Sequence, residues 1–148
     1  MCSSDLLMKT HLDMLAANGI GWVTPWLRTQ LVLSHVIRGE TDLAEQELER
    51  VRREASALGE NWVIGLFDIA EAEICKGKED FQGAEEWLLQ AITFARQQSS
   101  KGVELRAATS LARLWRDQGK RSEAYDLLAP IYDWFTEGCD PPDLIGAK

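Results

Sequence analysis

The chain has 148 residues, of which 45% are hydrophobic and 27% are charged, and its 24 acidic and 16 basic side chains give a net charge of −8. This length is typical of one domain, and we expect a single domain over residues 1–148. Nucleic acids and anionic membranes bind basic surfaces, so the acidic balance argues against both as general partners.

Residues 96–121 depart from this acidic balance. They contain seven basic and two acidic side chains, a local charge of +5, so the rest of the chain carries −13. A solvated helix face is the simpler interpretation of this basic stretch. A surface that binds an anionic group is the alternative.

The three cysteines, Cys2, Cys75 and Cys139, are an odd number and have no CxxC spacing. Neither a disulfide framework nor a zinc site is expected, and the thiols indicate a reducing compartment. The first residues lack the pattern of a signal peptide, and no apolar run reaches the length of a membrane span. We therefore expect a cytoplasmic protein without a metal or another cofactor.

The spacing of apolar residues predicts helices along the whole chain and no strand of alternating type. In chain order the predicted helices span 4–17, 22–38, 41–57, 61–76, 80–98, 102–118 and 121–135, and an irregular tail begins at about residue 136. Gly39 and Gly119 mark turns between helices, and a longer connection runs from Gly77 to Phe81. Gly138 and the pair Pro141-Pro142 break the helical pattern in the tail.

An internal repeat of 40 residues orders these helices into pairs. Its core positions recur three times, as Ala44, Ala84 and Ala124, then Leu48, Leu88 and Leu128, then Val51, Ala91 and Ile131. Gly19 and Gly59 hold one phase of the repeat, and Trp22 and Trp62 hold another, whereas Gly102 falls three residues later than the glycine phase. One lone helix followed by three stacked helix pairs predicts a right-handed α-solenoid of about seven helices, with a concave and a convex face.

The pattern Gly119-x4-Ala124-x3-Leu128-x2-Ile131 resembles the tetratricopeptide signature. The 40-residue period is similar to an extended variant of that repeat in large bacterial signalling ATPases. Residues 104–144, ELRAATSLARLWRDQGKRSEAYDLLAPIYDWFTEGCDPPDL, look similar to the C-terminal end of the predicted ATPases and adenylate/guanylate cyclases of bacteria. The resemblance implies a detached sensor or docking array, because the ATPase and cyclase chemistry of those proteins lies upstream and the chain has no GxxxxGK[ST] loop.

This sequence departs from the family pattern after the FTEG segment. Family members continue into a helix that caps the stack, whereas Cys139, two prolines and Gly146 stand here. An uncapped helix pair leaves apolar surface exposed, which solenoids normally avoid. We therefore expect self-association into a homodimer through Tyr132, Trp134 and Phe135.

The concave face of such an array is formed by one side of the first helix of each pair. By spacing, its residues are Trp26, Thr29, Gln30, Leu33, Leu66, Ile69, Ala70, Glu73, Arg106, Thr109, Arg113 and Arg116. This groove is apolar at one end and cationic at the other, so we expect a peptide or protein ligand with an apolar anchor and an acidic group. Arg113 and Arg116 are suited to hold a carboxylate or phosphate in fork geometry. The alternative is a solvated face without a ligand.

A small hydrolase is the alternative from another functional class. His35, Cys75 and Trp115 share one phase of the repeat, and a thiolate nucleophile needs a neighbouring base. Groove carboxylates are the other candidates for such an enzyme, although Glu71 and Glu73 point apart on a helix. Tetratricopeptides place a large core residue at the phase of His35 and Cys75, so burial is the favoured interpretation and no catalytic residue is predicted.

Overall fold

The computed structural model describes residues 3–19, 24–59 and 61–138, and these residues are helical throughout apart from short turns. The elements are α1 (Ser3–Ala17), α2 (Thr24–Ile37), α3 (Thr41–Leu58), the 3-10 helix η2 (Asn61–Val63), α4 (Ile64–Gly77), α5 (Phe81–Gln97), α6 (Lys101–Asp117) and α7 (Arg121–Gly138). The described residues contain no strand, and the predicted all-α class is confirmed. Within the same ranges, no helix combines the length and apolarity that crossing a membrane requires.

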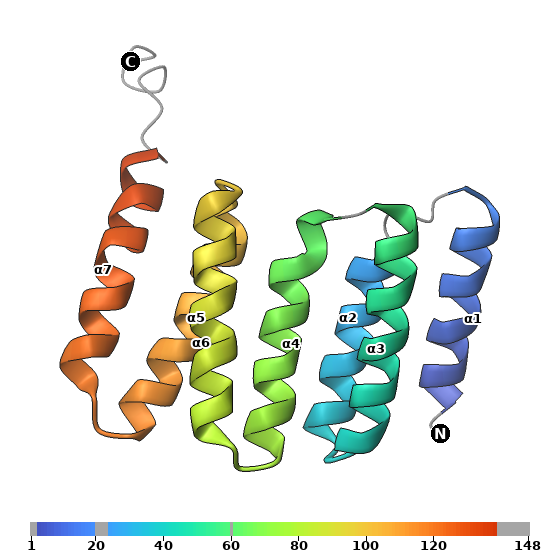
Figure 1. Ribbon diagram of the computed structural model, residues 1–148, viewed down its shortest axis with the longest axis horizontal. Coiled ribbons are helices and arrows are strands. Elements are labelled where there is room, and N and C mark those ends of the chain that lie inside the picture. Colours follow the sequence, from blue (N-terminus) through green and yellow to red (C-terminus); the bar gives the residue numbers. More distant parts are fainter. Residues whose placement is uncertain (1–2, 20–23, 60, 139–148) are drawn as a thin grey trace, which may run out of the picture.

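The helices lie side by side in a row, with α1 at one end and α7 at the other (Figure 1). Each α-helix packs against the next along the chain, and α4 also contacts α2 and α6. The first helices of the three pairs therefore adjoin one another, which is the arrangement needed for a surface that runs across α2, α4 and α6.

The turns between helices repeat at a regular interval. Among the described residues six have a positive φ angle, and they are Gly19, Gly39, Gly59, Glu79, Ser99 and Gly119, each 20 residues after the one before. The turn after Gly39 is closed by the bond from Glu40 N to His35 O (2.9 Å), and the turn after Ser99 by the bond from Ser100 N to Ala95 O (2.8 Å). Each of the helices α1 to α6 is thus followed within two residues by a left-handed residue, whether or not that residue is glycine.

The same turns explain the irregular glycine spacing in the third repeat. Ser99 holds the position that corresponds to Gly19 and Gly59, and its φ angle is 54°. Gly102 lies inside the first turn of α6. The third repeat therefore keeps the spacing of the other two and replaces the glycine of the turn with serine.

The core is built from the predicted repeat positions. All three alanines, Ala44, Ala84 and Ala124, are buried, and Leu48 and Leu88 are 1% and 0% exposed. Leu128, the third leucine of the series, is only half-buried. Burial at one repeat position therefore decreases toward α7, because a described helix follows α3 and α5 in the row and none follows α7.

The predicted boundaries need three corrections, the first of which is that the connection from Gly77 to Phe81 is no longer than the connection from Ile37 to Thr41. The last helix was expected to stop at residue 135, but α7 continues to Gly138, and the Thr136 hydroxyl donates to the carbonyl oxygens of Tyr132 (3.1 Å) and Asp133 (3.0 Å). The expected helix at 61–76 begins with the 3-10 turn η2. Trp22, Cys2 and residues 139–148, which include Cys139, lie outside the described residues.

Candidate binding surfaces

A hollow of about 560 Å³ opens across α2, α4 and α6, and we call it the central groove. Its lining consists of Leu33, Val36, Ile37, Ile69, Glu73, Lys76, Gly102, Leu105, Arg106, Thr109, Ser110 and Arg113. One part of this lining is aliphatic and comes from all three helices. The charged part comes from α4 and α6 only.

Six of the predicted groove residues line the central groove: Leu33, Ile69, Glu73, Arg106, Thr109 and Arg113. The other six, Trp26, Thr29, Gln30, Leu66, Ala70 and Arg116, do not. Thr29, Leu66 and Ala70 are buried, and the Thr29 hydroxyl donates to the carbonyl oxygens of Pro25 and Trp26 in its own helix. In α2 and α4 the groove therefore lies farther along the helix than the spacing argument placed it, whereas in α6 it begins earlier, at Gly102, and does not reach Arg116.

Some groove residues were missing from the prediction, and Ile37 is the clearest case. It is 85% exposed at the end of α2 and lines the groove four residues after Leu33. A helical stripe that includes Leu33 also contains the positions three and four residues later, so Val36 and Ile37 were within reach of the spacing argument. The isoleucine at position 37, four residues after Leu33, was the feature of the sequence that could have extended the predicted groove.

A closed polar network ties α4 to α6 across the groove. Lys76 Nζ lies 2.7 Å from Glu73 Oε1, and the Ser110 hydroxyl donates to the same oxygen over 2.8 Å. Lys76 Nζ also donates to Ser110 Oγ over 3.0 Å. These three groups satisfy one another, so the network fixes the spacing of the helices and leaves ligand binding to other residues.

Two arginines on the groove have no such partner. Arg106 and Arg113 are exposed, and no ion pair joins either of them to another described residue. They are seven residues apart on α6, so they lie on one face about 10 Å from each other along the helix. The central groove therefore combines an aliphatic wall with two guanidinium groups that are available to an anionic ligand.

A second hollow, of about 730 Å³, lies between α6 and α7, and we call it the end slot. Its lining consists of Thr109, Ala112, Arg113, Arg116, Arg121, Ala124, Tyr125, Leu128, Ala129, Tyr132 and Asp133. Thr109 and Arg113 line both hollows. The two surfaces therefore meet at α6.

The residues predicted for self-association have different surroundings. Tyr132 lines the end slot and is exposed. The rings of Trp134 and Phe135 pack edge to face with centroids 4.9 Å apart, and Lys101 Nζ lies 5.5 Å from the centre of the Trp134 ring. Trp134 and Phe135 thus hold α7 against its own neighbours. Tyr125, seven residues before Tyr132, is one of several slot residues that the prediction missed.

The structure does not bring Cys75 and His35 together as a catalytic pair. His35 Nδ1 lies 2.7 Å from Glu40 Oε2, and no hydrogen bond between described residues joins it to Cys75. Burial raises the pKa of the Cys75 thiol, and the nearby Asp80 carboxylate raises it further. Because the thiolate is the nucleophilic form, these surroundings disfavour covalent catalysis at Cys75. Among the described residues, no group of three metal-ligand side chains is arranged to hold an ion.

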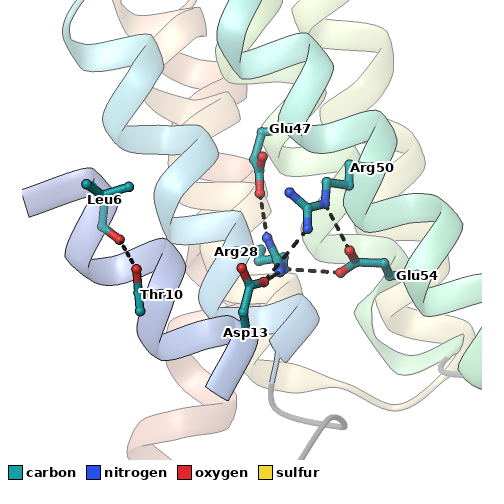
Figure 2. A network of polar contacts seen from close by, with 7 residues as sticks. All are labelled: Leu6, Thr10, Asp13, Arg28, Glu47, Arg50 and Glu54. Carbon is teal, nitrogen blue, oxygen red and sulfur yellow. Dashed lines mark hydrogen bonds and ion pairs between the residues drawn. The ribbon is translucent and has the colours of Figure 1, made fainter. Parts of the chain in front are cut away.

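At the opposite end of the row, the buried side chain of Arg28 joins three helices (Figure 2). Its guanidinium lies 2.7 Å from Asp13 of α1, 3.0 Å from Glu47 and 3.1 Å from Glu54, both of α3. Arg50 also lies 3.1 Å from Glu54 and 3.8 Å from Asp13. Burial acts to lower the pKa of Arg28, but the three carboxylates outweigh it and raise that pKa. Arg28 therefore serves the packing of α1, α2 and α3.

Comparison with protein-family models, with curated proteins and with solved structures gives no match for this chain.

Proposed function

We propose that the protein is a binding module without catalysis of its own, and that its central groove holds a peptide or protein segment with an acidic group. The observation that carries this proposal is the pair Arg106 and Arg113, exposed and without ion pairs among the described residues, beside an aliphatic wall. Structural arginines in this chain behave differently, since Arg28 is buried against three carboxylates.

The lining of the groove suggests how such a ligand binds. Leu33 and Ile37 of α2 and Ile69 of α4 offer an apolar surface for one anchoring side chain of the ligand. Arg113 then forms a bidentate hydrogen-bonded pair with a carboxylate, the geometry that guanidinium groups favour. The Glu73 carboxylate is occupied by Lys76 and Ser110, so it does not repel an acidic ligand as a free carboxylate would.

The proposal extends to the architecture and its setting. We infer a tetratricopeptide-like, right-handed α-solenoid, supported by the 40-residue repeat and by left-handed turns every 20 residues. By resemblance, the chain corresponds to the array of a bacterial signalling ATPase or cyclase. The free thiol of Cys75 supports a reducing, cytoplasmic setting.

The test uses a library of fluorescein-labelled peptides about ten residues long, which span about 33 Å when extended. Each peptide carries a single Asp or Glu at a different position in an alanine and leucine background. Fluorescence anisotropy with the full chain is expected to select acidic peptides over their Asn and Gln counterparts. Arg106→Glu is expected to weaken the best peptide about tenfold or more.

The matched control is Arg53→Glu. Arg53 is an exposed arginine of α3 that does not line the central groove, so the same change in net charge leaves the groove intact. Equal losses in the Arg106→Glu and Arg53→Glu proteins would mean that only net charge is sensed. That result, or the absence of binding by every library peptide, would contradict the proposal.

A further inference from the structure

The end slot lies between the two helices of the last pair, α6 and α7. At the two corresponding places earlier in the row, the next helix along the chain packs against the pair before it. Helix α4 packs against both α2 and α3, and α6 packs against α5 and α4. Each incoming helix buries one carboxylate that an arginine of the preceding helix faces. Asp68 of α4 lies 3.7 Å from Arg52, and Glu104 of α6 lies 2.7 Å from Arg96. In both cases, then, the helix that packs against the preceding pair has an apolar face and a buried carboxylate directed at an arginine.

The end slot has the walls for a third such helix. Within the part of the chain that the structure describes, no helix fills it. Leu128 is half-buried there, whereas Leu48 and Leu88 at the same repeat position are almost completely buried. Arg113 and Arg116 on the α6 wall are exposed, and among the described residues the only ion-pair partner of either is Asp117, the residue adjacent to Arg116. The slot therefore offers apolar surface next to two exposed arginines of α6, whereas in the two internal contacts the arginine, Arg52 or Arg96, belongs to the second helix of the preceding pair.

Helix α7 itself has the acidic charge and the exposed aromatic side chains that would complement the slot. It contains four carboxylates and one arginine, a net charge of −3. Tyr125 and Tyr132 are 73% and 59% exposed and lie seven residues apart, on one face of the helix. Asp126 and Asp133 follow them by one residue each and form an exposed acidic row beside that face.

We propose that the end slot is the contact surface of a homodimer, in which α7 of a second copy packs against α6 and α7 of the first. The tyrosines of each copy cover the apolar lining of the other, and Asp126 and Asp133 of each copy face Arg113 and Arg116 of the other. Because both copies give and receive the same helix, the contact is isologous and closes at two subunits. This interface goes beyond the proposed peptide binding and does not depend on it.

The first measurement is the mass of the full chain by light scattering after size exclusion, across a dilution series. A dimer that dissociates on dilution is expected. Two charge-reversed proteins then test the contact: Arg113→Glu with Arg116→Glu, and Asp126→Arg with Asp133→Arg. Each alone is expected to weaken the dimer about tenfold or more, because like charges then face each other across the interface.

The decisive sample is the equimolar mixture of the two reversed proteins. In a heterodimer every reversed glutamate faces a reversed arginine, so native mass spectrometry is expected to show the heterodimer as the main dimeric species. A contact within one chain gives no such rescue. All four substituted residues are exposed, and circular dichroism checks that each variant remains helical. Tyr132→Arg is an independent variant that is expected to dissociate the dimer.

Several results would overturn the dimer. These are a monomer at every concentration, a dimer that survives both charge reversals and Tyr132→Arg, or a mixture without heterodimer. A monomer that dimerises only after removal of residues 139–148 would assign the slot to the chain's own C-terminal segment instead. Arg106→Glu, which tests the central groove, is expected to leave the dimer unchanged, so failure of one proposal is distinguishable from failure of the other.

Discussion

The two ends of the helix row use arginine in opposite ways. At the α1 end, Arg28 is 1% exposed and its guanidinium is surrounded by Asp13, Glu47 and Glu54. At the α7 end, Arg113 and Arg116 are exposed, and no described carboxylate of another helix pairs with them. A buried guanidinium that pairs with three carboxylates stabilises the packing of helices, whereas an exposed one beside apolar surface is available to a ligand. Residue type alone does not separate the two roles.

The largest expected effect is at the α1 end. Arg28 is the only cation among the described residues that forms an ion pair with Glu47, so Arg28→Met leaves that largely buried carboxylate unpaired. Breaking a buried pair in this way costs about 3–5 kcal/mol, so urea unfolding is expected to show a loss of that order. The matched change Arg116→Met at the other end is expected to alter stability by no more than about 0.5 kcal/mol. Equal losses of unfolding free energy in the Arg28→Met and Arg116→Met proteins would contradict the different roles assigned to the two arginines.

The next effect compares one repeat position in the middle and at the end of the row. Leu88→Ala creates a cavity at a fully buried site, and about 3 kcal/mol of stability is expected to be lost. Leu128→Ala acts at a half-buried site and is expected to cost about half as much at low protein concentration. If α7 of a second copy covers Leu128, the cost of Leu128→Ala increases with protein concentration, and unfolding at two concentrations measures this.

A smaller effect concerns the turns that lack glycine. Glu79 and Ser99 have φ angles of 62° and 54°, a region that side chains other than glycine enter at a cost. Glu79→Gly and Ser99→Gly are each expected to stabilise the fold by about 0.5–1 kcal/mol, after the higher entropy of unfolded glycine is deducted. Gly119→Ala is the reverse change and is expected to lower the melting temperature. Destabilisation by both new glycines would show that these turns are not strained.

The smallest effect is a difference in pH dependence between the two carboxylates of the incoming helices. Burial raises the pKa of Asp68 and Arg52 only partly offsets it, so this group costs stability as pH rises through its folded pKa. Asp68→Asn is therefore expected to stabilise at pH 7, with a gain that disappears below about pH 4. Thermal unfolding across this range checks both the sign and the window.

Glu104 is the opposite case. Burial acts to raise its pKa, but hydrogen bonds from Arg96 and Lys101 outweigh this and lower it. Its stabilising contribution is present above the unfolded pKa and is lost as pH falls through the lowered folded value. Glu104→Gln is therefore expected to destabilise at pH 7 and to approach the parent protein in acid. The same sign of pH dependence in the Asp68→Asn and Glu104→Gln proteins would contradict the assigned causes.

The sequence was a good guide to features that depend on local periodicity. The seven helices and the burial of Ala44, Ala84 and Leu88 follow from apolar spacing, because one helical face must enter the core wherever helices stack. The left-handed turn at Ser99 was not predictable from its residue type, since serine rarely adopts that conformation. Only the continued 20-residue interval pointed to it.

The binding surfaces were predicted less completely. Leu66 was placed in the groove but lies in the core, and Ile37 was left out although it lines the groove. Spacing defines which residues share a helix face, but the packing of neighbouring helices decides how much of that face remains open. The carboxylates around Arg28 come from two other helices, so no local sequence pattern predicts this network.

Arg113 lines both the central groove and the end slot, so the two proposed binding events share one guanidinium. A guanidinium that is engaged with a carboxylate in one hollow is withdrawn from the other. Occupancy of the groove therefore competes with occupancy of the slot, and each lowers the affinity of the other by the same factor. If the groove ligand and the dimer are as proposed, the ligand is expected to act as a negative effector of dimer assembly through the single shared side chain of Arg113.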